Sequence, residues 1–244
     1  AGIAMGLLLL GNPKTGPLED MLRYAHDTKH DKIIRGLGLG ISLTMLGQEE
    51  QADALISRLS KDNDFILRVG AMWTVASAYA GTTNNSAIRR LLHVAVSDVN
   101  DDVRRTAVMA LGFVMLRAPA QVPKLVSLLS ESYNPHVRYG SCMAIGVACA
   151  GTANQDALDL LLPMLKDKES FVRQGALMAS ALVLMQENEQ RCTHVKALRA
   201  TIEEIAGDKR ESIIAKFGAV VAAGILDAGG RNMCVALTSR TGFL

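Results

Sequence analysis

The sequence predicts an all-α protein, an α-solenoid of stacked helix hairpins, and three observations support this fold class. One type of segment recurs about every 35 residues along the chain. Amphipathic segments of helical length lie between its copies, whereas the copies themselves are apolar on nearly all sides. Aromatic residues make up only 4% of the chain, which disfavours a β-sandwich and suits close packing of helices.

The recurring segment aligns in six copies without internal gaps. In one-letter code the copies are IRGLGLGISLTMLG (34–47), RVGAMWTVASAYAG (68–81), RRTAVMALGFVMLR (104–117), RYGSCMAIGVACAG (138–151), RQGALMASALVLMQ (173–186) and KFGAVVAAGILDAG (216–229). Gly2 extends the series backward, and the step lengthens to 43 residues before the last copy. We expect about seven repeats, each with an inner helix that its neighbours cover on both sides.

The intervening segments carry apolar residues at helical spacing with charged residues opposite, and we expect them to form the outer helices. They are LEDMLRYA (18–25), ADALISRL (52–59), AIRRLLHVA (87–95), VPKLVSLL (122–129), ALDLLLPML (157–165) and HVKALRATIEEI (194–205). Short polar connectors join the two kinds of helix and supply Asp, Asn and Ser residues that can cap the next helix. Each unit is therefore a helix hairpin.

Small residues form a stripe along one face of each inner helix, and this explains glycines that cost about 1 kcal/mol each in a helix interior. Removing Cβ atoms along a stripe allows two helix backbones to approach closely. The predicted stripe comprises Gly36, Gly40, Gly47, Gly70, Gly81, Gly140, Ala144, Gly151, Gly175 and Gly218. A second small column points elsewhere on the same helices, at Ser42, Ala76, Gly112, Gly146, Ala181 and Gly224.

A basic residue stands at the start of each copy, and we interpret the series as a structural charge ladder. Its members are Arg68, Arg104, Arg138, Arg173 and Lys216, with Arg35 displaced by one place. A cation near a helix N-terminus opposes the helix dipole, so each needs a nearby acid. Local candidates are Asp64, Asp101, Glu169 and Glu211. A phosphate-binding stripe is the less favoured alternative.

Composition excludes several function classes. A net charge of +2 gives no reason to expect nucleic acid or an anionic membrane as partner. No secretory signal opens the chain, and the longest apolar run is far short of the roughly 20 residues that span a bilayer. We expect a cytoplasmic and nuclear protein whose four cysteines are small buried hydrophobes. Because the chain starts without Met inside an apolar segment, we also expect a fragment of a longer protein.

Other motifs that resemble functional sites are better explained by helix packing or chance. GLGLGIS (36–42) lacks the third glycine of the dinucleotide fingerprint and follows no strand. His26 and His30 have i, i+4 spacing but no third ligand nearby. Cys192 and His194, two apart on a helix, point in different directions and do not form a nucleophile and base. We therefore expect no cofactor, no metal and no enzymatic activity.

The pattern Arg-x-Gly-Ala, followed by small and apolar residues up to Ala-Gly-Thr, resembles the proteasome/cyclosome repeat over almost the whole chain. The ending KFGAVVAAGILDAGGRNMCVALTSRTG (216–242) resembles the close of the repeat region in scaffold subunits of the proteasome regulatory particle. The resemblance implies an α-toroid, with two rings of helices, that serves as a non-enzymatic docking platform. About seven repeats are fewer than a full ring of the family contains, so both a closed toroid and an open arc remain as alternatives.

The chain is accordingly expected to be a single repeat domain, 1–244, with a non-repeat segment at 230–244. Expected partners are other proteasome regulatory subunits, in the service of ubiquitin-dependent degradation. One alternative is direct binding of ubiquitin or ubiquitin-like domains by outer helices. Another is an unrelated HEAT-type transport adaptor, for which Asp102 to Arg104 would serve equally well.

Overall fold

A computed structural model describes residues 1–228, and every regular element in that range is helical. Thirteen α-helices and two short 3-10 helices are present, with no strand among residues 1–228. The predicted all-α class is therefore confirmed. The non-repeat segment predicted at 230–244 lies outside the described residues.

The helices fall into two compact units, Ala1–Val114 and Met115–Leu244. In chain order the first contains α1 (Gly2–Leu8), α2 (Thr15–Asp27), α3 (Asp31–Thr44), η1 (Glu49–Ala52), α4 (Asp53–Ser60), α5 (Phe65–Ala78), α6 (Asn85–Ser97) and α7 (Asp101–Val114). The second contains η2 (Pro119–Gln121), α8 (Val122–Ser130), α9 (Pro135–Ala148), α10 (Gln155–Met164), α11 (Ser170–Leu184), α12 (Thr193–Gly207) and α13 (Ile213–Ala228). The single domain expected from the sequence stays a prediction.

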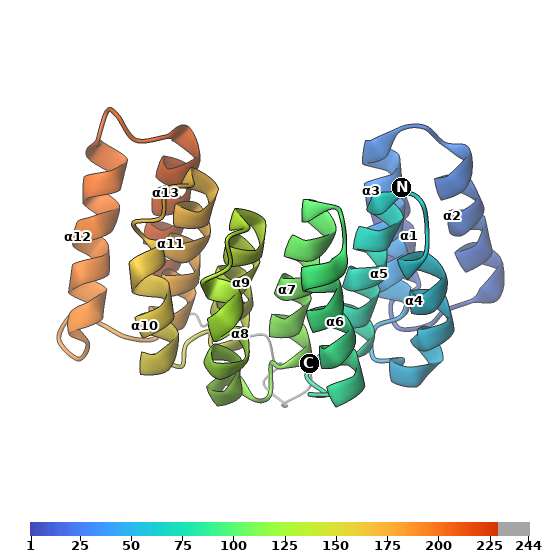
Figure 1. The fold of residues 1–244 in the computed structure, drawn as a ribbon, viewed down its shortest axis with the longest axis horizontal. Coiled ribbons are helices and arrows are strands. Elements are labelled where there is room, and N and C mark those ends of the chain that lie inside the picture. The colour runs from blue at the N-terminus through green and yellow to red at the C-terminus, as the bar shows by residue number, and fades with distance from the viewer. Residues whose placement is uncertain (229–244) are drawn as a thin grey trace. The chain divides into compact units, whose positions relative to one another are not determined.

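Each unit is a stack of helix hairpins with two kinds of helix (Figure 1). In the first unit α1, α3, α5 and α7 pack on one another in succession, and α2, α4 and α6 each pack on the inner helix that follows. In the second unit α9, α11 and α13 form the inner series, with α8, α10 and α12 outside. The inner helices contain the recurring segments and the outer helices contain the amphipathic ones, so the predicted α-solenoid of hairpins is confirmed.

Polar side chains in the connectors cap the N-termini of several helices, as predicted. Asp64 accepts a hydrogen bond from the backbone N–H of Ile66 at 2.8 Å, at the start of α5. Asn84, Asn134 and Asn154 cap α6, α9 and α10 in the same way. These carboxylate and amide oxygens satisfy N–H groups that have no partner within the helix.

The core of each unit lies between its inner helices and between the inner and outer helices, and it includes hydroxyl groups as well as apolar side chains. Thr74 on α5 is fully buried, and its hydroxyl donates to the Gly70 carbonyl of the preceding turn at 2.8 Å. Ser141 on α9 donates to Val137 in the same manner. Buried hydroxyls that bond their own helix avoid the cost of an unsatisfied polar group. Trp73 is half-buried and meets Phe113 edge to face, with ring centroids 5.9 Å apart.

Candidate functional site

The contact between consecutive inner helices is the recurrent site of this molecule, and glycines mark its closest points. A Cβ built on Gly146 of α9 would lie 2.8 Å from the Cα of Ala179 on α11. A Cβ on Gly70 of α5 would lie 3.2 Å from the Cα of Gly38 on α3. At these separations the two backbones touch, and a larger side chain would push them apart.

Three further residues of the predicted stripe face a neighbouring helix at short range. A Cβ on Gly40 would overlap the Gly2 carbonyl of α1. A Cβ on Gly175 would lie 2.8 Å from the ring of Tyr139, and one on Gly218 would lie 2.8 Å from the Cα of Gln174. The structure therefore brings Gly40, Gly70, Gly175 and Gly218 into inter-helix contacts.

Other small residues of the stripe are placed differently. Gly140 and Ala144 are buried on α9. Gly36 itself has open space where a Cβ would be, although its carbonyl lies 2.8 Å from the position of a Cβ on Gly2. Gly224 of the second column also has open space around it.

Gly47, Gly81 and Gly151 lie beyond the ends of the inner helices and have positive φ angles of 70°, 67° and 68°. The left-handed conformation ends each helix and favours glycine, because a Cβ would clash with the backbone. These three glycines thus share a role in backbone conformation that the stripe did not predict, and a Cβ on Gly151 would also lie 3.0 Å from the side chain of Gln186.

The same turns connect one inner helix to the next through backbone hydrogen bonds. Gly81 N–H donates to the Phe113 carbonyl at 2.9 Å, and Gly151 N–H donates to the Leu182 carbonyl at 2.8 Å. Gly11 and Gly47 make equivalent bonds, to Leu43 and Ser77. The acceptors are carbonyls near the C-terminal end of the next inner helix, where no intrahelical donor is available. This role was not predicted from the sequence, although the Ala-Gly-Thr endings at 80–82 and 150–152 are its signal.

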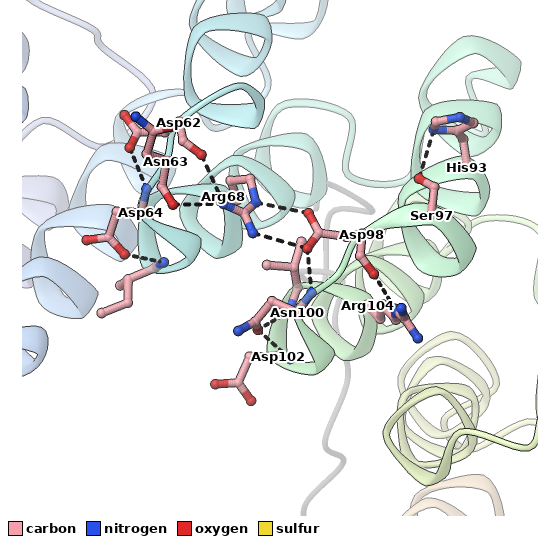
Figure 2. Close-up of polar contacts among 12 residues, drawn as sticks. Asp62, Asn63, Asp64, Arg68, His93, Ser97, Asp98, Asn100, Asp102 and Arg104 are labelled. Atoms are coloured by element: carbon pink, nitrogen blue, oxygen red, sulfur yellow. Dashed lines mark hydrogen bonds and ion pairs between the residues drawn. The ribbon is translucent and has the colours of Figure 1, made fainter.

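At the opposite end of the inner helices, arginines of the charge ladder join one hairpin to the next. Arg68 on α5 donates from Nε and Nη2 to both carboxylate oxygens of Asp98, at 3.0 and 3.2 Å (Figure 2). Its Nη1 donates to the carbonyls of Asp62 and Asn63 in its own connector. Asp98 lies in the following connector, so one guanidinium holds two successive connectors together.

The arrangement recurs in the second unit. Arg138 donates to both carboxylate oxygens of Asp167 at 2.7 and 2.9 Å, while Arg173 donates to the backbone carbonyl of Asp167 at 2.6 Å. Asp98 has the same dual role in the first unit, since its carbonyl accepts from Arg104. Arg173 also pairs with Glu211. We call each arginine with its next-connector acid an inter-repeat clamp.

The clamps correct part of the sequence analysis. Asp64 and Glu169 were expected as local partners of the ladder, but Asp64 caps its own helix and the carboxylates that pair with Arg68 and Arg138 lie about 30 residues further on. Helix hairpins stacked in register bring such distant residues together. Glu211 pairs with the arginine of the preceding inner helix, whereas Asp101 lies 3.9 Å from Arg104 in its own helix. Within residues 1–228, Lys216 forms no salt bridge, and the acid beside Arg104 belongs to its own helix, so neither residue forms a clamp.

The clamp acids are held in their ionised form. Burial opposes ionisation of Asp98 and Asp167, but hydrogen bonds from the arginine and from a backbone N–H outweigh it, so the pKa of each carboxyl is lowered. Hydrogen bonds from the Ser212 N–H and from Arg173 also lower the pKa of Glu211.

The first clamp position uses a histidine in place of an arginine. Asp62 corresponds to Asp98 and Asp167, but Ile34 occupies the matching helix position and Arg35 turns to Asp102. His26 at the end of α2 bonds Asp62 through Nε2 at 2.9 Å and the Leu22 carbonyl through Nδ1 at 2.8 Å. The bond to Leu22 and then the bond to Asp62 raise the pKa of His26.

The remaining reactive side chains are packed in the core or scattered. Cys142 and Cys149 are fully buried, and burial raises the pKa of both thiols, that of Cys149 to about 11. Cys192 is only half-buried, which corrects the expectation that all four cysteines are buried, and Cys234 lies outside the described residues. Within residues 1–228, no three side chains of His, Cys, Asp or Glu gather in a way that could hold a metal ion. In the same range, each helix is too short or too polar to cross a lipid bilayer.

A sequence profile described as HEAT repeats matches residues 88–181 and 122–215, which together span more than half of the chain. The chain belongs to the HEAT repeat family. Among solved structures, a designed armadillo repeat protein in complex with a (KR)4 peptide aligns with 92% of this chain and 99% of its own length, at a TM-score of 0.45 and 18% identity.

Proteasome subunits are similar to this HEAT repeat chain over nearly its whole length. The 26S proteasome non-ATPase regulatory subunit 1 of Drosophila melanogaster is 56% identical over 243 residues, 99% of this chain and 24% of the fly protein. Homolog B of that subunit in Arabidopsis thaliana is 57% identical over 241 residues, 99% of this chain and 24% of the plant protein. The regulatory subunit rpn2 of Schizosaccharomyces pombe is 49% identical over 244 residues, 100% of this chain and 25% of the yeast protein.

These relatives confirm the resemblance that the repeat motif indicated. The chain spans about a quarter of their length.

The close approach at Gly146 predicts opposite effects of two equivalent substitutions. Gly146→Ala should lower the free energy of unfolding by about 1–3 kcal/mol, because the new Cβ would meet Ala179 at 2.8 Å. Gly224→Ala, in open space within α13, should raise it by about 1 kcal/mol through helix propensity. Urea unfolding followed by circular dichroism measures both, and equal effects would contradict close backbone contact at Gly146.

The clamp between Arg138 and Asp167 predicts a pH-dependent loss of stability. Arg138→Gln should cost about 2–3 kcal/mol at pH 7, because the largely buried carboxylate of Asp167 loses its charged partner. The cost should persist above about pH 4 and shrink as the pH falls through the lowered pKa of Asp167, where the folded carboxyl takes up a proton.

Urea unfolding at a series of pH values measures this effect. Arg23→Gln is the matched control, because the Arg23–Asp20 pair is 75% and 63% exposed, and it should change stability by less than about 0.5 kcal/mol. A similar effect of both substitutions would show that the clamp adds nothing to an ordinary surface ion pair.

The histidine at the first clamp position predicts a stability difference near neutral pH. Because the folded pKa of His26 is raised, its stabilisation should be complete below about pH 6.5 and be lost as the pH rises through the folded value. The melting temperature of His26→Gln should therefore fall further below that of the unmodified chain at pH 6 than at pH 8.5. His93→Gln, whose ring bonds Ser97 of its own helix, is the control. A His26→Gln deficit that does not change with pH would refute this assignment.

Proposed function

We propose that this chain is part of a non-enzymatic scaffold in the base of the 26S proteasome regulatory particle. It would dock other regulatory subunits for ubiquitin-dependent protein degradation, in the cytoplasm and the nucleus. The observation that carries the proposal is the 56% identity over 99% of the chain to a subunit named for that particle. The HEAT profile alone would fit an unrelated transport adaptor equally well.

The architecture within each unit supports a docking role. Close backbone contacts, clamps and backbone hydrogen bonds join each hairpin to the next, so the outer helices and connectors are held on a stiff support. A surface that is ordered before binding loses less conformational entropy when a partner docks. The toroid implied by the repeat resemblance, and the open arc that is its alternative, stay predictions.

A segment exchange tests the proposal. Drosophila cells that lack their own subunit would be given a chimera, which is the fly protein with its matching segment replaced by this chain. We expect assembled 26S proteasomes to be restored, as measured on native gels. A matched exchange with Gly146→Leu should fail, because overpacking at Ala179 disrupts the inner helices. Failure of the unmodified exchange, with the protein stably expressed, would contradict the scaffold role.

Titration of the isotope-labelled chain with ubiquitin, followed by NMR, separates the scaffold from the ubiquitin-binding alternative. A scaffold that acts through other subunits predicts no saturable shifts. Saturable shifts on outer-helix residues would favour direct recognition of ubiquitin.

A further inference from the structure

A groove in the second unit opens between two successive connectors, beside the Arg138–Asp167 clamp. Its volume is about 550 Å³, and its lining includes Glu131, Tyr133, Arg138, Asp167, Lys168 and Glu169. Folding accounts for the two clamp residues, because they hold the connectors together. It does not account for the other side chains of the groove.

Tyr133 is the most unusual of these side chains, because it is 99% exposed. The corresponding connector positions carry Asn63, Val99 and Lys168, so the aromatic ring is particular to this connector. Arg138 donates to the backbone carbonyls of Tyr133 and Ser132, at 3.0 and 2.9 Å, which holds the segment that bears the ring. Tyrosine is enriched among the residues that dominate binding interfaces, because its ring offers a large contact area at a low cost in conformational entropy.

The charges of the groove favour a cation. Arg138 and Asp167 neutralise each other through two hydrogen bonds. Neither Glu131 nor Glu169 forms a salt bridge within residues 1–228, although the charge of Glu169 acts on Arg138, and Lys168 is the other cation of the lining. Three carboxylates against two cations leave the lining with a net charge of −1.

The N-termini of the two adjacent helices, α9 and α11, do not favour binding of an anion. The His136 N–H donates to Asn134 at the start of α9, and the Glu169 N–H donates to Asp167 just before α11. Since these donors already have acceptors, the attraction of the helix ends for a negative ligand is reduced.

We propose that this groove docks an arginine side chain from a basic segment of a partner protein. The guanidinium would stack on the ring of Tyr133 and pair with the carboxylate of Glu131 or Glu169. Arginine fits better than lysine, because its planar group can stack on an aromatic ring and bond a carboxylate with two N–H groups at once. The inference rests on the proposed scaffold role only for the expectation that the partner is a protein.

NMR titration of the isotope-labelled chain tests the proposal with two peptides, Ac-Gly-Ser-Arg-Ser-Gly-amide and the same peptide with citrulline for arginine. Citrulline keeps the shape of the side chain but has no charge. We expect saturable shifts in the connectors at 131–134 and 167–169 with the arginine peptide, and binding at least about fivefold weaker with the citrulline peptide.

Substitutions locate the binding. Tyr133→Ala should weaken binding of the arginine peptide about threefold to fivefold, and Glu131→Gln combined with Glu169→Gln should weaken it by a similar factor. Tyr133→Ala should leave the fold intact because the ring is fully exposed. Val99→Ala, at the corresponding connector of the first unit and 87% exposed, is the matched control and should not change binding.

Three results would overturn the proposal. They are the absence of saturable shifts with the arginine peptide, equal affinity for the arginine and citrulline peptides, and an unchanged affinity of the Tyr133→Ala variant for the arginine peptide. Any of these with normal proteasome assembly in the segment exchange would leave the scaffold role standing. If the arginine peptide binds as expected but the segment exchange does not restore assembled proteasomes, the result would count against the scaffold role alone.

Discussion

Direct contact between the backbones of consecutive inner helices is the constraint on which the rest of the structure depends. Gly146 against Ala179 and Gly70 against Gly38 leave no room for a larger side chain at the crossing points. Each glycine inside a helix lowers helix propensity, and the dispersion contacts of two touching backbones offset that cost. Because both faces of an inner helix are covered in this way, its sequence is apolar on nearly all sides.

Two sets of polar contacts hold the ends of the inner helices once their backbones touch. At the start of the helices, connector aspartates bond an arginine on each side, as Asp98 does with Arg68 and Arg104. At the other end, left-handed glycines such as Gly81 turn their N–H groups toward carbonyls of the next helix. Every such contact joins nearest neighbours, so stability is built up hairpin by hairpin. The connectors and outer helices are thereby presented in a regular series.

Equivalent positions of successive repeats do not use equivalent chemistry. Asp98 and Asp167 bind arginines, which stay charged at every physiological pH, whereas Asp62 binds His26, whose charge changes near neutrality. At the last clamp, Glu211 takes the role of the aspartate, at a separation of 38 residues from Arg173. The exposed tip of one connector carries Tyr133, where the others carry Asn63, Val99 and Lys168. Variation of this kind lets a repetitive array present distinct surfaces.

The amino-acid sequence by itself determined the helices, their order and the two layers, because periodic apolar patterns and the 35-residue repeat depend only on local spacing. It also located the glycines and the basic series. Only the tertiary structure decided what these residues contact. Arg68 pairs with an acid about 30 residues away, and Gly47, Gly81 and Gly151 serve as left-handed turns while Gly70 and Gly175 meet a neighbouring helix. The physical reason is that partners in the next hairpin depend on the stacking register and on backbone conformation, which a local pattern in the sequence does not specify.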